Sequence, residues 1–114
     1  MDEERVTKQQ ALAEIIKQHS AETGKCSTAI PSLTFMRQNE RTGPAYGIHT
    51  LSLCIVAQGK KEVWLGQDRY PYGPGDYLVA TVDLPISGQV IEASPNTPYL
   101  ALKLEFTISQ VLEW

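Results

Sequence analysis

The sequence lacks a long hydrophobic run and a surplus of positive charge. Its longest apolar stretch, Leu51 to Ala57, is interrupted by Ser52 and is far shorter than the roughly 20 residues that a transmembrane helix needs. Ten Lys and Arg stand against thirteen Asp and Glu, which gives a formal net charge of -3. Binding to nucleic acid requires excess Lys and Arg to neutralise phosphates. We therefore expect these residues to bind neither DNA nor a membrane by themselves.

Cysteine is also scarce, and no signal peptide is visible. The chain begins Met-Asp-Glu-Glu-Arg, the opposite of the basic start of a secretory signal. This predicts a cytoplasmic protein, in which the two cysteines, Cys26 and Cys54, are free thiols. Because Cys54 lies inside an apolar run, we expect it to be a small buried hydrophobic residue rather than a nucleophile.

What the sequence does contain is enough apolar material for one core. Hydrophobic residues make up 42% of the chain and charged residues 20%, which predicts a single folded domain over residues 1–114. Leu12, Ile15, Ile16 and His19 recur at helical spacing. This periodicity predicts an N-terminal helix over about residues 4–19.

From Pro31 onward the pattern changes to short β-type runs separated by turn residues. Strands are expected at Leu33–Arg37, Leu51–Gln58, Glu62–Leu65, Tyr77–Val82, Gln89–Ala93 and Tyr99–Phe106. No helical pattern lies between them, which favours an antiparallel sandwich or barrel over about residues 30–106. The last run alternates, with Leu100, Leu102 and Leu104 on one face and Ala101 and Lys103 on the other. Residues 107–114 are expected to start a C-terminal helix.

The turns between these runs resemble those of small cupin barrels. Pro74-Gly75-Asp76 suits a tight turn, because Pro fixes φ, Gly accepts a positive φ and the Asp carboxylate can cap the turn. In metal-binding cupins a Glu precedes the first hairpin Gly by seven positions, where this chain has Ser52, and the second motif has a His where this chain has Ile86. The two upstream His positions fall on Tyr46 and Ile48, or on Ala45 and Gly47. We therefore expect a cupin-like barrel, or double-stranded β-helix, without metal or cofactor.

Three longer segments carry a more specific resemblance. Residues 44–61 (PAYGIHTLSLCIVAQGKK), 75–90 (GDYLVATVDLPISGQV) and 92–102 (EASPNTPYLAL) are similar to the N-terminal domain of AraC-type bacterial transcription regulators. The resemblance implies a non-enzymatic, effector-sensing domain that binds a small molecule and controls two helix-turn-helix units expected beyond residue 114. DNA would then be bound only through those units. The resemblance also allows a homodimer.

The counted motif positions select candidate ligand-binding residues. Ser52, Thr81 and Asp83 are expected at or beside the former metal site, with Tyr46, His49 and Trp64 near it. In such a pocket Trp64 would stack on the effector, and Ser52, Thr81 and Asp83 would form hydrogen bonds with it. The structural alternatives are that Trp64 fills the barrel or covers its outside, that Thr81 is an ordinary strand residue and that Asp83 caps a turn.

Two other classes of function stay open at this stage. One is a stand-alone, metal-free cupin enzyme of the sugar isomerase or epimerase type, with His49 as the base and a Tyr as the acid. The other is a purely structural dimerisation module. The pair Lys60-Lys61, which follows a hairpin Gly, is expected to be exposed and to protect a strand end from pairing with other chains.

Overall fold

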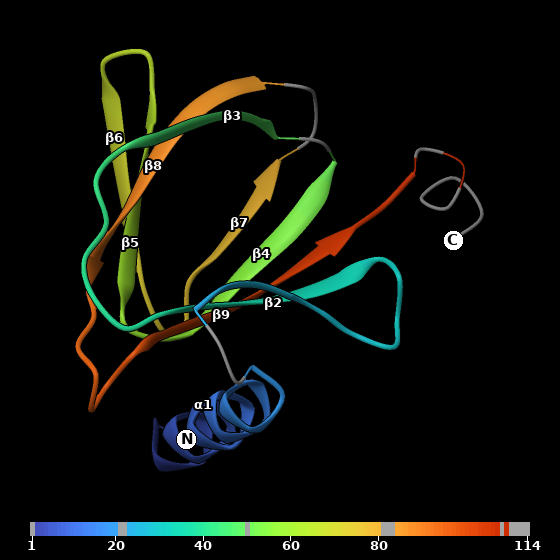
Figure 1. Ribbon diagram of the computed structural model, residues 1–114, viewed down its shortest axis with the longest axis vertical. Helices are drawn as coiled ribbons and strands as arrows, with labels where there is room; N and C mark the ends of the chain where they lie inside the picture. Colours follow the sequence, from blue (N-terminus) through green and yellow to red (C-terminus); the bar gives the residue numbers. More distant parts are fainter. Residues whose placement is uncertain (1, 21–22, 50, 81–83, 108, 110–114) are drawn as a thin grey trace.

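The computed structural model describes residues 2–20, 23–49, 51–80, 84–107 and 109, and they form one helix followed by strands (Figure 1). Helix α1 spans Asp2–Gln18, close to the predicted range. The strands are β1 Gly24–Ser27, β2 Leu33–Gln38, β3 Ala45–His49, β4 Ser52–Gln58, β5 Lys60–Leu65, β6 Asp68–Tyr72, β7 Tyr77–Ala80, β8 Leu84–Glu92 and β9 Tyr99–Glu105.

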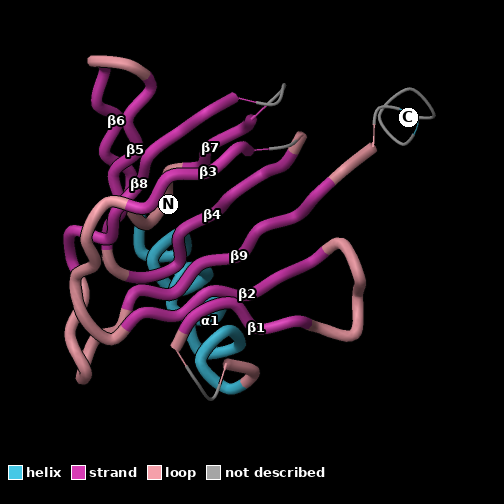
Figure 2. The backbone as a smooth tube through the Cα atoms, turned by 45° about the horizontal axis from the view of Figure 1, so that its top comes forward, coloured by secondary structure: helices cyan, strands magenta, loops and turns pink. Residues whose placement is uncertain are grey.

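The strands form two antiparallel sheets that face each other. One sheet has five strands in the order β1-β2-β9-β4-β7, and the other has four in the order β3-β8-β5-β6. Figure 2 shows the helix lying across the outer face of the five-stranded sheet. The predicted mainly-β, antiparallel architecture with an N-terminal helix is confirmed. Among the described residues the two sheets are not joined into a closed barrel, so the fold is an antiparallel β-sandwich.

The outer face of the five-stranded sheet is covered by α1. Ile16 and Leu100 are completely buried there. They pack with Ala13, Phe35 and Ala57. Ile15, which shares the predicted helical spacing, is instead 49% exposed. The apolar face that the helix buries against the sheet is therefore narrower than the sequence periodicity predicted.

A second core lies between the two sheets. The alternation predicted for the last strand is confirmed: Leu100 faces α1, whereas Ala101 packs against the opposite sheet. The residues of this inner core are Val56, Val63, Tyr72, Ile86, Val90, Tyr99 and Ala101. Lys103 is on the same side of β9 as Ala101, so its side chain belongs to the inner face.

Three strands were not predicted. β1 and β6 are short and polar, and β3 lies beside the Gly43-Pro44 pair that marked a loop. Their sequences carry little hydrophobic alternation, because these strands stand at sheet edges where one neighbour is missing. β8 also begins before the predicted Gln89. The helix expected over residues 107–114 lies almost entirely outside the described residues.

Two turns follow from glycine and aspartate chemistry. At the β4–β5 hairpin Gly59 has φ +81°, and a Cβ there would lie 2.6 Å from the carbonyl oxygen of Glu92. At the predicted Pro-Gly-Asp turn, the Gly73 N–H donates to the Asp76 carboxylate at 3.1 Å. The Asp76 N–H donates back to the Gly73 carbonyl at 2.9 Å. The carboxylate therefore caps this turn, as predicted.

Candidate functional site

Polar side chains gather on the inner face of the five-stranded sheet. Cys54 of β4 is paired in register with Lys103 of β9, and Ser52 with Glu105. Ser52 is completely buried and Cys54 is 4% exposed. The predicted site residue Ser52 therefore lies in the interior between the sheets, and Cys54 is the buried free thiol that the sequence predicted.

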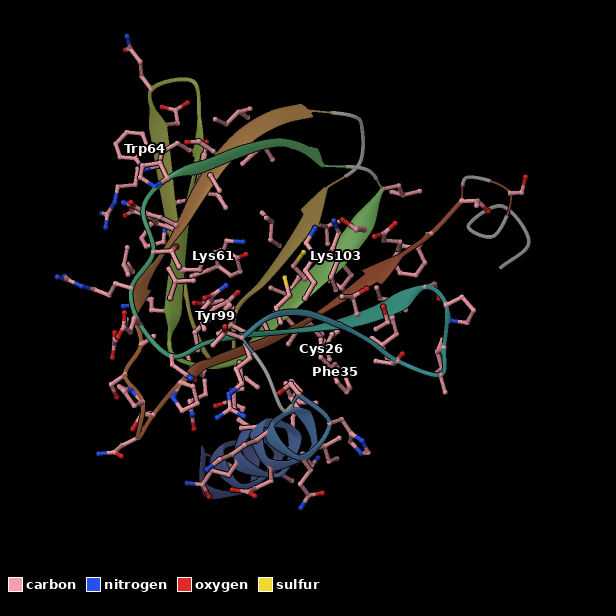
Figure 3. The ribbon with its side chains drawn as sticks, in the orientation of Figure 1. Cys26, Phe35, Lys61, Trp64, Tyr99 and Lys103 are labelled. Atoms are coloured by element: carbon pink, nitrogen blue, oxygen red, sulfur yellow. The ribbon has the colours of Figure 1, made fainter. Side chains whose placement is uncertain are left out.

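Lys61 reaches the same interior from the opposite sheet, as Figure 3 shows. It is paired with Tyr72 on one side and Val90 on the other, both of which belong to the inner core. The prediction that Lys60 and Lys61 are both exposed is therefore wrong for Lys61, because alternation along β5 turns neighbouring side chains to opposite faces. A Cβ at Gly88 would lie only 3.2 Å from the Lys61 Cε, so the absence of a side chain there leaves room for the lysine stem.

Lys61 brings a positive charge into this interior. Among the described residues no carboxylate lies within ion-pair distance of its ammonium group. Burial lowers the pKa of Lys61, and the positive charges of Lys103 and Lys25 lower it further, while Cys54 opposes them. Lys103 has a partner at the C-terminal end of β9, since its Nζ lies 3.8 Å from Glu105 Oε1.

The same lysines act on Cys54. Burial raises the pKa of the Cys54 thiol, and the charges of Lys103 and Lys61 only partly offset this effect. The thiol form therefore prevails at neutral pH. Because a thiolate is the reactive form, this environment does not make Cys54 a strong nucleophile.

Tyr99 contributes a buried hydroxyl to the inter-sheet space. Its side chain is 2% exposed, and within the described part of the chain its Oη has no hydrogen-bond partner. Burial raises the pKa of Tyr99 well above its usual range, as it does for Tyr72. Both phenols are therefore neutral and able to donate or accept a hydrogen bond.

Lys61 and Tyr99 border a cavity of about 260 Å³ between the sheets, which we call the inter-sheet cavity. It lies between β1 and β3, which are edge strands of the two sheets. Lys25, Gly43 and Ala45 on its rim are exposed, so it opens to solvent at this edge. Its lining consists of Gly24, Lys25, Met36, Gln38, Thr42, Gly43, Ala45, Lys61, Gly88, Gln89, Val90 and Tyr99.

Trp64, another predicted site residue, does not face this interior. It alternates with the buried Val63 along β5, and its Nε1–H donates to Glu62 Oε1 at 3.3 Å on the outer face. There the Glu62 carboxylate also accepts hydrogen bonds from Gln89 and Arg69. The bond from Gln89, followed by that from Arg69, lowers the pKa of Glu62. The side chain of Trp64 therefore lies on the outer face of the sheet, and a ligand-binding role for it stays a prediction.

The other predicted site residues are only partly described. The backbones of Tyr46 and His49 lie in β3, opposite Ser87 and Leu84 respectively, but their side chains lie outside the described set. Thr81 and Asp83 lie outside the described residues altogether. A ligand-binding role for these four residues stays a prediction, as does the proposed base His49.

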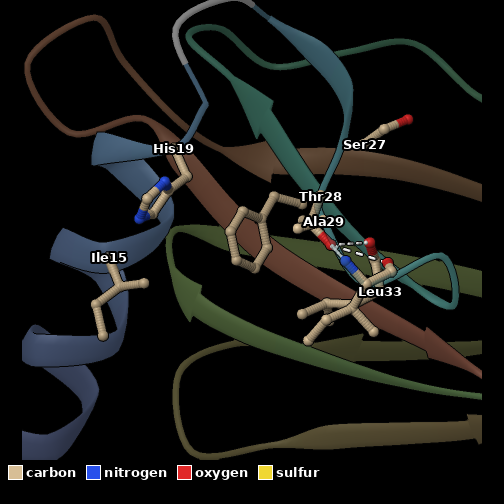
Figure 4. Close-up of a pocket in the computed structure, with 8 residues that line it drawn as sticks. Ile15, His19, Ser27, Thr28, Ala29 and Leu33 are labelled. Carbon is tan, nitrogen blue, oxygen red and sulfur yellow. Dashed lines mark hydrogen bonds between the residues drawn. The ribbon is translucent and has the colours of Figure 1, made fainter.

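A second, mainly apolar pocket of about 390 Å³ lies between α1 and the β1–β2 connection (Figure 4). His19 and Phe35 stand 6.3 Å apart between their ring centroids. The Thr28 hydroxyl holds the connecting loop by donating to the Leu33 carbonyl at 2.8 Å. It also accepts from the Ile30 N–H at 3.1 Å. This pocket carries no buried charge, in contrast to the inter-sheet cavity.

Within the described residues two other kinds of feature were not found. No group of three or more His, Cys, Asp or Glu is placed to hold a metal ion. No helix in this part of the chain is long and apolar enough to cross a membrane.

Solved structures support the class of fold. A cupin-2 domain protein from Shewanella frigidimarina NCIMB 400 superposes with a TM-score of 0.54 and 7% identity, covering 83% of this chain and 92% of that one. The Drosophila melanogaster CENP-C cupin domain gives a TM-score of 0.52 and 13% identity, covering 92% and 98%. At such identities the likeness shows the cupin fold alone.

The family follows from the sequence. The model of the AraC-type transcriptional regulator N-terminus matches residues 29–114. The chain therefore belongs to this family, as the resemblance of its three segments implied. No curated protein sequence matches it.

Proposed function

We propose that this domain is the effector-sensing part of an AraC-type transcription regulator and that it binds a small molecule in the inter-sheet cavity. The observation that carries the proposal is the family match over residues 29–114. A regulatory family supports a non-enzymatic role. DNA binding is assigned to helix-turn-helix units encoded beyond residue 114, and a cytoplasmic location and a homodimer stay predictions.

The inter-sheet cavity supports the sensing role. Ligand pockets combine apolar walls with a few oriented polar groups, and here Met36 and Val90 stand beside Lys61 and Tyr99. An effector there would contact both sheets at once. It could shift a conformational equilibrium only if it bound one arrangement of the sheets more tightly than the other.

The first experiment determines the coding sequence beyond the Trp114 codon. A continuation into two helix-turn-helix units, each with a basic recognition helix, would support the regulator. The complete protein is then expressed, its DNA site is selected from random sequences, and a reporter carrying that site is followed during growth on different carbon sources. A reading frame without such units, or a complete protein that selects no DNA sequence, would refute the proposal.

A matched pair of variants locates the sensing site. Ala45→Trp places a large side chain on the exposed rim of the inter-sheet cavity. Ala29→Trp places the same side chain on an exposed alanine of the pocket beneath α1. We expect the reporter to lose its response in Ala45→Trp and to keep it in Ala29→Trp. The reverse result would move effector binding to the pocket beneath α1.

A further inference from the structure

The lining of the inter-sheet cavity is positively charged in a protein that is acidic overall. The formal net charge of the chain is -3, yet the cavity is lined by Lys25 and Lys61, and none of its described lining residues is acidic. Lys25 comes from the five-stranded sheet and Lys61 from the four-stranded sheet. Two positive charges therefore face one space from opposite walls.

Among the described residues, the charge of Lys61 lacks the compensation that a structural role would provide. Charged side chains that are buried for structural reasons are normally paired. Lys61 is largely withdrawn from solvent, and its carboxylate partner is missing among the described residues. Its nearest ionisable neighbours include Lys103 and Lys25, which repel it. An anion in the cavity would supply the missing countercharge.

Tyr99 provides a second, independent indication of a ligand. Its hydroxyl is buried, unpartnered within the described chain and attached to a ring that lines the same cavity as Lys61. A buried hydroxyl without a partner is unfavourable, and most such groups are satisfied by something that binds them. A neutral phenol that lines the same cavity as an ammonium group is suited to donate to an anionic oxygen bound there.

We infer that the inter-sheet cavity binds a small organic anion whose carboxylate or phosphate group contacts the Lys61 ammonium and the Tyr99 hydroxyl. Lys25, on the exposed rim, attracts the anion to the opening. A volume of about 260 Å³ is below the range of about 300–1,000 Å³ typical of drug-sized ligands, so the ligand is a small metabolite rather than a nucleotide or a lipid. This inference rests on the proposed function, because it names the chemical class of the effector.

The test compares charged probes with uncharged partners that share their carbon skeleton. Benzoate and succinate are titrated against benzamide and succinamide, and glycerol phosphate against glycerol, into the full-length protein by calorimetry. We expect an anion to bind and its uncharged partner to bind about ten- to hundredfold more weakly, because hydrogen bonds to charged groups are the strong ones. The carboxylate and phosphate titrations show which of the two anionic groups the cavity accepts.

Variants then connect this binding to the cavity. Lys61→Met is expected to weaken anion binding by about ten- to hundredfold, and Tyr99→Phe by about three- to tenfold. Lys61→Arg retains the charge and should retain most of the affinity. Lys60→Met removes the neighbouring charge, which lies on an exposed position of the same strand, and should leave the affinity unchanged.

Each failure has a separate meaning. Equal binding of anions and their uncharged partners, or anion binding that Lys61→Met does not change, would overturn the anionic class while leaving an effector cavity in place. The absence of binding by every carboxylate and phosphate probe would also overturn it. A complete protein that selects no DNA sequence would instead refute the regulator proposal, whatever the cavity binds.

Discussion

Replacing Tyr99 with Phe should stabilise the folded protein. The ring is 2% exposed and its hydroxyl has no hydrogen-bond partner in the described chain. Burying a hydroxyl without a partner costs about 1–3 kcal/mol in mutational data. Phe keeps the ring and its packing, so the substitution removes this cost without creating a cavity. We expect a gain of about 1 kcal/mol, at the lower end of that range.

The gain can be measured by thermal unfolding. For a domain of this size about 1 kcal/mol corresponds to a rise in Tm of about 4 °C. Tyr72→Phe is the matched control, since Tyr72 lies in the same inner core but its hydroxyl is not a fully buried, unpartnered group. Its Tm should change less than that of Tyr99→Phe.

The opposite sign would refute the reasoning. If Tyr99→Phe lowered the Tm by several degrees, the hydroxyl would be making a favourable bond in the ligand-free protein. The same pair of proteins, measured with a bound anion, should show a smaller advantage for Phe, because the ligand stabilises only the folded state that contacts it.

Three further predictions concern the strands around the inter-sheet cavity. Gly59→Ala should destabilise the protein by about 2 kcal/mol in urea unfolding, since Ala is strained at φ +81° and its Cβ would meet the Glu92 carbonyl; an unchanged midpoint would contradict this. Lys61→Met should raise the stability at neutral pH. Burial lowers the pKa of Lys61 in the folded protein from its usual 10.5, so the destabilisation caused by its charge is fully present below the folded-state pKa. This destabilisation disappears as the pH rises toward 10.5, where the free energies of unfolding of the two proteins should converge. Glu62→Gln should lower the stability at neutral pH. Because the pKa of Glu62 in the folded protein is below 4.5, this loss of stability should vanish as the pH falls through that pKa. A difference in stability that stays the same in acid would show that the charge is not involved.

The features of the fold that local chemistry determines could be predicted from the sequence. The Pro74-Gly75-Asp76 turn depends on its own three residues and is formed as expected, down to the carboxylate cap. The alternation in β9 also depends only on neighbouring residues, and it correctly separated Leu100 from Ala101. Alternation alone did not say which face meets the second sheet, because both faces of β9 are covered, one by α1 and the other by the four-stranded sheet.

The candidate site was harder to predict, because a charge pattern normally indicates a solvated surface. Lys61 follows a hairpin Gly and precedes Glu62, and such a cluster of charges normally marks a strand end in water. In the structure Glu62 is 3% exposed on the outer face, and Lys61 points into the interior. These directions follow from the place of β5 between β6 and β8, and β8 is remote from it in sequence.

The contrast between Lys61 and Glu62 also indicates that the unbalanced charge of Lys61 does not result from poor packing around β5. Glu62 receives hydrogen bonds from Arg69, Gln89 and Trp64, so the outer face of β5 satisfies its buried carboxylate. One residue earlier, on the inner face of the same strand, the ammonium of Lys61 has no carboxylate partner among the described residues. The hydrogen bonds to Glu62 show that side chains around β5 can neutralise a buried charge, so the same could have been expected for Lys61 if its role were only structural. Because the uncompensated groups, Lys61 and Tyr99, both lie on the inter-sheet cavity, their cost is confined to the place where a bound anion could repay it.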